Sequence, residues 1–239
     1  MKLVQEAFSK ETFVTNAGFT LPYRLYVPDG YSEKNRYPVF LYLHGAGERG
    51  TDNVKQLWHY IQPLFNSVAS PMYGAIVVAP QCPLDQQWVN VPWKNGNYDF
   101  DSTPISEALA AVLELLDDIN KRYATDVDRC YVSGLSMGGF GTWDICMRDP
   151  DRFAAAVPLC GASDHKKASL IKHIPIRTYH GSSDDTVPVS GTKRMVKALE
   201  KVGADIYFDE LSGVNHNAWD YAAADSKMLP WLFSQKRKS

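Results

Sequence analysis

The chain has 239 residues, of which 45% are hydrophobic and 22% charged, and its formal net charge is −2. This composition is that of a soluble globular protein and excludes disordered and fibrous classes, while the near-neutral charge excludes a global field that would attract nucleic acid or an anionic membrane. No apolar run approaches the roughly 18 residues of a transmembrane helix. We therefore expect residues 1–239 to form a single domain with one active site.

The sequence does not decide the cellular compartment of the protein. The first residues lack the apolar core of a secretion signal, which fits a cytoplasmic protein and equally a mature secreted or periplasmic chain. The four cysteines are too few for a disulfide scaffold and form no Cys-x-x-Cys pair, so neither a metal nor a redox cofactor is expected. Cys130 and Cys160 lie in apolar runs, which predicts that they are buried.

The predicted elements begin with a β-hairpin. Residues 12–15 and 20–27 have strand character and are separated by the turn-forming cluster Asn16-Ala17-Gly18. Short and nearly continuous apolar runs follow at residues 39–43, 75–79, 130–132, 154–159 and 176–179. Runs without polar alternation predict strands that are buried on both faces, as parallel sheets require.

Helical patterns lie between these runs. The clearest covers residues 106–123, where apolar side chains recur at helical spacing. Others cover residues 137–147, 191–202 and 218–233, and we expect Pro230 to kink or shorten the last. Strands that alternate with helices predict an α/β fold, with a mostly parallel central sheet covered by helices on both faces. Residues 81–101 show no clear periodicity, and long irregular loops of this kind are often functional.

The sharpest local motif is Gly134-Leu135-Ser136-Met137-Gly138, which lies between a predicted strand and a predicted helix. In the pattern G-x-S-x-G, a tight strand-to-helix turn projects a serine hydroxyl clear of the backbone, where a base can activate it. The helix that follows directs N–H groups and its positive dipole end toward developing negative charge. Ser136 is therefore the candidate nucleophile, whereas Ser133 has no glycine two residues before or after it and is expected to be structural.

A serine nucleophile needs a base and an acid. In hydrolases with this motif the chain order is serine, acid, histidine, and His216 is the best placed histidine, in a turn-rich loop after the predicted strand at 205–211. The acid should follow the strand at 176–179, where Asp184 and Asp185 are adjacent. Their side chains diverge, so only one can serve, and spacing alone does not choose between them. His180, at the end of that strand, is expected to be structural.

The oxyanion of an acyl-transfer reaction requires two hydrogen-bond donors. The helix start after Ser136 offers the N–H of Met137, and His44-Gly45-Ala46-Gly47 follows the strand at 39–43. A His-Gly motif in this position supplies the second donor in lipases, and small residues let the backbone approach the substrate closely. We expect the N–H of Ala46 to be that donor.

The motifs HGAGERG, APQCP, GLSMGG, HGSSDDTVP and NHNAW resemble esterases of the phospholipase/carboxylesterase and dienelactone-hydrolase branch of the α/β-hydrolase fold. They are most similar to bacterial proteins called predicted peptidases and to carbohydrate esterases of the feruloyl and acetylxylan type, over residues 22–231. The resemblance implies a triad of Ser136, Asp184 and His216, because the family pattern H-G-x-x-D-x-x-V-P places the acid on Asp184. It also implies a serine carboxylesterase that needs no cofactor.

The substrate is less well defined. Trp88 and Trp93 lie in the irregular segment and could form the floor of a substrate pocket or simply pack in the core. Glu48 and Arg49 either line the entrance or pair with each other. No insertion resembles a lipase lid, which favours an open site for small-molecule or polysaccharide-linked esters. The alternatives are a peptidase or thioesterase with the same triad and a non-catalytic binding module, which the complete set of motifs disfavours.

Overall fold

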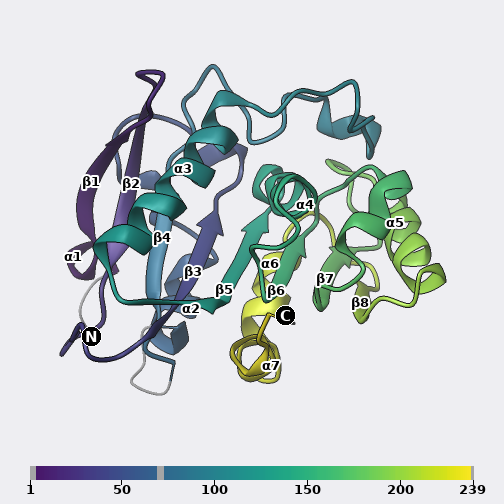
Figure 1. The fold of residues 1–239 in the computed structure, drawn as a ribbon. Coiled ribbons are helices and arrows are strands. Elements are labelled where there is room, and N and C mark those ends of the chain that lie inside the picture. The colour runs from purple at the N-terminus through teal and green to yellow at the C-terminus, as the bar shows by residue number, and fades with distance from the viewer. Residues whose placement is uncertain (1–3, 69–72, 238–239) are drawn as a thin grey trace.

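In the computed structural model, which describes residues 4–68 and 73–237, an eight-stranded sheet forms the centre of the molecule (Figure 1). The order across the sheet is β1-β2-β4-β3-β5-β6-β7-β8. β2 is antiparallel to β1 and β4, and the other neighbouring pairs are parallel. This confirms the predicted hairpin and mostly parallel sheet. The strands are β1 (Ser9–Val14), β2 (Thr20–Tyr26), β3 (Tyr37–Leu43), β4 (Ile76–Pro80), β5 (Thr125–Leu135), β6 (Ala155–Leu159), β7 (Ile176–Gly181) and β8 (Ile206–Leu211).

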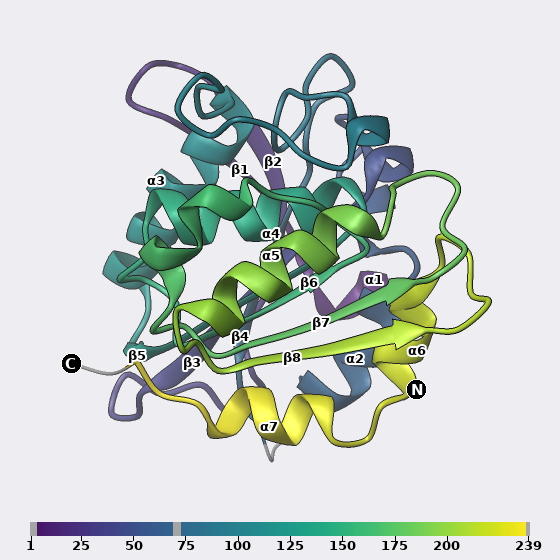
Figure 2. The ribbon, with the colours of Figure 1, turned by 90° about the vertical axis from the view of Figure 1, so that its right-hand side faces the viewer.

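Helices cover both faces of the sheet, as Figure 2 shows. One face carries α3 (Glu107–Arg122), α4 (Met137–Arg148) and α5 (Ser190–Lys201). The opposite face carries α1 (Val4–Ala7), α2 (Ile61–Val68), α6 (Ala218–Ala224) and α7 (Met228–Ser234). Alternate residues of β3 therefore enter two separate hydrophobic clusters, which explains why the central strands are continuous apolar runs.

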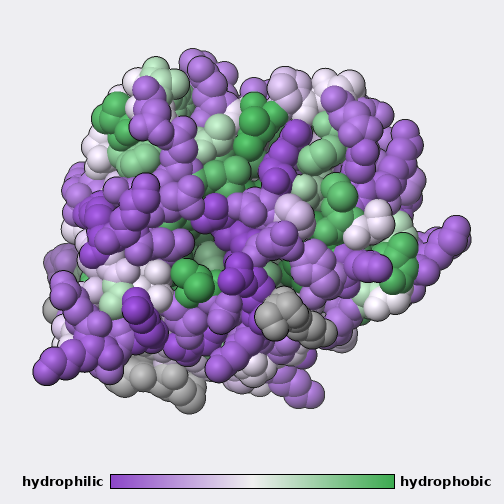
Figure 3. All heavy atoms as spheres, in the orientation of Figure 1, coloured by the Kyte–Doolittle hydropathy of each residue, from purple (hydrophilic) through white to green (hydrophobic). Residues whose placement is uncertain are grey.

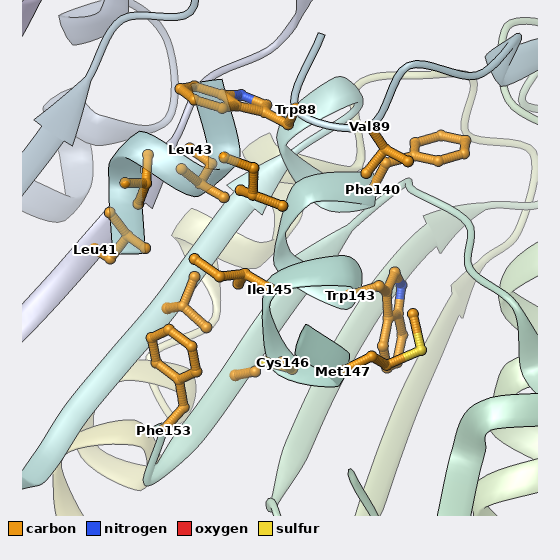
Figure 4. Packing of buried hydrophobic residues seen from close by; sticks show 14 of the residues in the cluster. Leu41, Leu43, Trp88, Val89, Phe140, Trp143, Ile145, Cys146, Met147 and Phe153 are labelled. Atoms are coloured by element: carbon orange, nitrogen blue, oxygen red, sulfur yellow. The ribbon is translucent and has the colours of Figure 1, made fainter. Parts of the chain in front are cut away.

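The helix α4 lies deep in the first cluster (Figure 4). Residues 137–147 of this helix are all buried, so it lacks the polar stripe of a surface helix. Trp143, Ile145 and Met147 pack among side chains from the neighbouring strands and loops (Figure 4). Because α4 begins directly after Ser136, this packing also holds the candidate nucleophile in place.

The last helical pattern differs from the prediction. Residues 218–233 form two helices, and the break at residues 225–227 lies before Pro230. Pro230 is the third residue of α7, where a backbone N–H has no partner within the helix, so proline is tolerated there. Asp225 sits at the break, where its carboxylate accepts hydrogen bonds from the Tyr179 hydroxyl at 2.6 Å and the Lys227 N–H at 2.8 Å.

Within residues 4–68 and 73–237, no helix combines the length and the apolar composition needed to cross a bilayer. On the face shown in Figure 3, hydrophobic residues form small groups among hydrophilic ones. The large apolar side chains with high exposure lie on separate elements and include Val14, Trp58, Leu84, Val127, Tyr207 and Tyr221.

Candidate active site

The predicted site residues come together at the carboxyl ends of the parallel strands. Ser136 follows β5, Asp184 follows β7 and His216 follows β8. Residues 45–48, hereafter called the oxyanion loop after the role predicted for Ala46, follow His44 at the end of β3. Parallel strands end at one edge of their sheet, and this edge is where open α/β sheets bind ligands.

Ser136 has a backbone conformation that few L-residues adopt, with φ 54° and ψ −116°. The strand β5 and the helix α4 leave no intervening loop, so the turn at this single residue is sharp. A hydrogen bond from the Ser136 N–H to the Leu159 carbonyl at 2.9 Å fixes the turn to β6. Gly138 is required for the close approach of α4 to β3, since a Cβ at this position would overlap the Leu43 carbonyl.

A continuous chain of hydrogen bonds joins the serine, the histidine and the aspartate. The Ser136 Oγ lies 2.7 Å from Nε2 of His216, and Nδ1 of His216 lies 2.7 Å from Oδ2 of Asp184. A carboxylate can only accept, so the histidine proton belongs on Nδ1 and Nε2 is left to accept the serine proton. This is the geometry of an activated serine.

The structure separates the two adjacent aspartates. Oδ1 of Asp184 accepts hydrogen bonds from the backbone N–H groups of Thr186 and Val187 at 2.9 and 2.8 Å. Burial would raise the pKa of Asp184, but the hydrogen bonds from His180, His216 and Val187 hold it well below the usual range. Asp185 is instead exposed and contacts Asn215 at 3.1 Å. Of the two aspartates, only Asp184 is hydrogen-bonded to His216.

His180 and Ser133 are both fully buried and hydrogen-bonded within the fold, as expected for structural residues. His180 is fully buried, with Nδ1 2.8 Å from Oγ1 of Thr192 and Nε2 2.9 Å from the Val187 carbonyl and 3.1 Å from Oδ2 of Asp184. His180 therefore contacts the Asp184 carboxylate from within the core and helps to hold it in place. The Ser133 hydroxyl donates to the Val157 carbonyl at 2.8 Å within the sheet and has no exposed surface.

A cavity of about 230 Å³ opens over the serine. Met137 is the first residue of α4, so its N–H has no acceptor within the helix and is free for a ligand. Ala46 lines the cavity together with Gly45 and Gly47, which places the oxyanion loop beside Ser136. The rest of the lining comes from Glu48, His59, Trp93, Leu135, Thr186, His216 and Trp219.

Trp219 and His59 line the cavity and were not among the predicted site residues. Trp219 packs edge-to-face on His216, with ring centroids 5.5 Å apart and an interplanar angle of 89°. It is the last residue of the NHNAW motif, and its place three residues after the histidine at the start of α6 was the available signal. His59 has a left-handed φ of 57° and belongs to no motif, so the sequence offered no signal for it.

Of the two roles that the sequence leaves open for Trp88, the structure supports packing in the core and not a place in the substrate pocket. Its exposed fraction is 0%, and it packs among core side chains above Leu43 (Figure 4). Its indole N–H donates to the carbonyl of His44 at 3.0 Å. The irregular segment therefore contributes one tryptophan to the core, while Trp93 is half-buried and lines the cavity.

This difference predicts opposite phenotypes for the two tryptophans. Trp88→Ala should lower the free energy of unfolding by about 3–5 kcal/mol, because it removes a fully buried indole from a packed core. Trp93→Ala should lose less stability and instead raise KM for ester substrates. Urea unfolding and steady-state kinetics of both variants check this, and equal losses of stability would contradict it.

Glu48 and Arg49 do not pair with each other. The Glu48 side chain is 8% exposed, with Oε1 3.4 Å from Nε2 of His59, and burial raises the pKa of its carboxyl group. Arg49 ties the oxyanion loop to the irregular segment: Nε donates to the Ala46 carbonyl at 3.0 Å, and Nη1 donates to the Leu84 and Gln86 carbonyls at 3.2 Å each. Arg49 thus braces the loop from outside the cavity.

One group of side chains has the spacing of a metal site. Donor atoms of Cys160, Asp184 and His216 lie within 4.8 Å of one another. The aspartate and the histidine are already hydrogen-bonded to each other, and burial raises the pKa of the Cys160 thiol, which disfavours the thiolate that a metal binds. All four cysteines are free and buried, as predicted for Cys130 and Cys160.

Comparison with known families places this site in context. The model of the family described as "Putative esterase" matches residues 18–169, which is more than half of the chain. The chain belongs to the Esterase family. The match includes the oxyanion loop and Ser136, whereas Asp184 and His216 lie beyond it.

Solved structures and curated proteins agree with this family. The chain is 34% identical to a thermostable esterase, with a TM-score of 0.88 over 98% of this chain and 64% of that one. It shares its fold with a mutant feruloyl esterase module from Clostridium thermocellum in complex with sinapinate, at 19% identity and a TM-score of 0.68, over 97% and 89% of the two chains. A bifunctional acetylxylan esterase/xylanase from Neocallimastix patriciarum is 32% identical over 76 residues, which are 32% of this chain and 11% of that protein.

Three curated proteins that the chain matches are all longer than the matched region. The chain covers between 11% and 59% of their lengths, so it corresponds to a part of each. The structural match confirms the predicted α/β-hydrolase fold. Family and fold together support a carboxylic ester hydrolase.

Proposed function

We propose that residues 1–239 form one catalytic domain, a serine carboxylesterase that acts through an acyl-enzyme on Ser136. The observation that carries the proposal is the hydrogen-bond chain from Ser136 through His216 to Asp184, which opens into the cavity beside the oxyanion loop. Each group has the partner that its chemical role requires.

The reaction follows from this geometry. Nε2 of His216 removes the Ser136 proton as Oγ attacks the ester carbonyl, and the carboxylate of Asp184 stabilises the imidazolium that forms. The N–H groups of Ala46 and Met137 hold the negative charge on the carbonyl oxygen. His216 then returns the proton to the departing alcohol, and water repeats the sequence on the acyl-enzyme to release the acid.

The shape of the site favours short-chain acyl esters or aryl and carbohydrate-linked esters. The cavity over Ser136 is small, at about 230 Å³, and two tryptophans line it. A larger groove of about 670 Å³ shares Trp93 with that cavity and carries the polar side chains of Asp85, Gln87, Asn90 and Lys94. A sugar-bearing substrate would use such a surface, because pyranose rings stack on aromatic faces and bind polar groups at their edges. The names of the feruloyl and acetylxylan esterase relatives support the same substrate class.

Covalent labelling tests the proposal directly. A fluorophosphonate should add one phosphonyl group to the chain, which mass spectrometry of peptides should locate on Ser136, and 4-nitrophenyl acetate should give a pre-steady-state burst of 4-nitrophenol. A panel of acetylated xylan, methyl ferulate, short acyl esters and peptide amides then defines the substrate. Labelling at another residue, or hydrolysis without an acyl-enzyme, would refute the assignment of Ser136.

A further inference from the structure

His44 lies at the end of β3, directly before the oxyanion loop, and is fully buried. Its ring makes a hydrogen bond at each nitrogen: Nε2 with the backbone N–H of Cys82 at 2.9 Å, and Nδ1 with the carbonyl of Gly45 at 2.6 Å. A backbone N–H can only donate and a carbonyl can only accept, so both bonds exist together in one neutral tautomer, with the proton on Nδ1. Burial also lowers the pKa of His44 to about 4, which keeps the ring neutral.

The carbonyl held by His44 belongs to the same peptide group as the Ala46 N–H. In a trans peptide the C=O and N–H point in opposite directions, so the bond to the Gly45 carbonyl also sets the direction of the Ala46 N–H. His44 lies outside the lining of the cavity, whereas Gly45, Ala46 and Ser136 line it. The Ala46 N–H therefore points away from the His44 ring, and the cavity that Ala46 shares with Ser136 is where we place its acceptor.

The Gly45–Ala46 peptide group itself has few other hydrogen bonds, since Arg49 binds the Ala46 carbonyl, which belongs to the next peptide. Gly45 has no side chain to restrict rotation, and the other hydrogen bond to its carbonyl comes from the Glu48 N–H at 3.4 Å, which is long. A peptide flip would direct the Gly45 carbonyl oxygen at the developing oxyanion and replace attraction with repulsion. The short bond from Nδ1 opposes that flip.

We propose that His44 is a positioning residue of the esterase: its Nδ1–H tautomer locks the Gly45–Ala46 peptide in the orientation that presents the Ala46 N–H to the oxyanion. The proposal rests on the function proposed above. It also gives Trp88 and Cys82 a role, since the Trp88 indole N–H binds the His44 carbonyl and the Cys82 N–H selects the tautomer.

Two substitutions separate the two hydrogen bonds of the ring. In His44→Asn the side-chain amide can occupy the place of Nδ1 and donate to the Gly45 carbonyl, but it cannot reach Cys82. In His44→Gln the side-chain carbonyl can reach the place of Nε2 and accept from the Cys82 N–H, but the donor to Gly45 is lost. Each variant keeps one of the two bonds, so the two form a matched pair for stability.

The proposal predicts different catalysis from this pair. His44→Gln should lower kcat for 4-nitrophenyl acetate by about 100-fold, the loss typical of a missing oxyanion donor, with little change in KM. His44→Asn should keep kcat within about tenfold of the wild type. Urea unfolding should give similar stabilities for the two variants, since each keeps one hydrogen bond. If His44 had a purely structural role, kcat would instead follow stability. Equal kcat values in the two variants, or a greater loss in His44→Asn, would overturn the proposal.

Two further measurements separate this proposal from the assignment of Ser136. Affinity for an aryl trifluoromethyl ketone, whose serine adduct carries an oxyanion, should fall in His44→Gln and persist in His44→Asn. Long-range ¹H–¹⁵N spectra of the wild-type enzyme should show the His44 proton on Nδ1 at pH 7, and a proton on Nε2 would overturn the inference whatever the activity. Absence of fluorophosphonate labelling at Ser136 of the wild-type protein would instead refute the proposed function.

Discussion

Ser136→Ala is expected to lower kcat for 4-nitrophenyl acetate by about six orders of magnitude, the loss typical of removing a triad serine. The variant loses the Oγ that lies 2.7 Å from Nε2 of His216, so no acyl-enzyme can form. The cavity and the proposed oxyanion donors remain, and they should leave a residual rate of about 10³–10⁴ over water. Stopped-flow and long-incubation assays, with the wild-type active sites titrated by fluorophosphonate, cover this range.

Ser133→Ala is the matched control. Ser133 lies three residues earlier in β5, is fully buried, and bonds to the Val157 carbonyl rather than to a catalytic group. Its replacement should lose about 1 kcal/mol of stability and leave kcat close to the wild-type value. Wild-type kcat in Ser136→Ala, or an inactive but folded Ser133→Ala, would contradict the assignment of the nucleophile.

Asp184→Asn should lower kcat by about four orders of magnitude, whereas Asp185→Asn should leave it nearly unchanged. An amide at position 184 can donate its N–H to Nδ1 of His216, which moves the histidine proton to Nε2. Nε2 would then face the serine hydroxyl as a donor and could not accept its proton. Asp185 makes only exposed contacts, with Thr186 and Asn215, so its amide variant disturbs no part of the hydrogen-bond chain.

The KM of Asp184→Asn should change much less than its kcat, because the carboxylate does not line the cavity. Steady-state kinetics of both variants on the same ester provide the measurement, with circular dichroism to show that each is folded. A large loss in Asp185→Asn with an active Asp184→Asn would exchange the roles of the two residues.

The sheet could be predicted from the sequence because its central strands are buried on both faces. Residues 39–43 and 154–159 are uninterrupted apolar runs. Strands of a sheet with one face in solvent would instead alternate apolar and polar residues. The sharp turn at Ser136 was predictable for a related reason, since a turn as tight as this one needs glycines beside it. Such local requirements leave a local trace in the sequence.

Other features depend on contacts between distant segments and left no such trace. Trp88 and Trp93 are both tryptophans in the same aperiodic segment, and only the packing of that segment over α4 buries the first. Spacing did not choose between Asp184 and Asp185, because the choice depends on where the loop after β8 brings His216. The helix break at residues 225–227 likewise depends on the Tyr179 hydroxyl, which comes from β7.

The backbone conformation of Ser136 lowers the stability of the fold while it holds the hydroxyl in the position that the proposed activity requires. A non-glycine residue held at φ 54° carries strain of about 1–3 kcal/mol, and glycine would relieve it. Stability selection acting alone would therefore favour loss of the proposed nucleophile, and a thermal screen of variants at this position should enrich inactive proteins. The serine persists only where the reaction itself is under selection, so its retention in a set of relatives would report use of the enzyme and not merely folding of the chain.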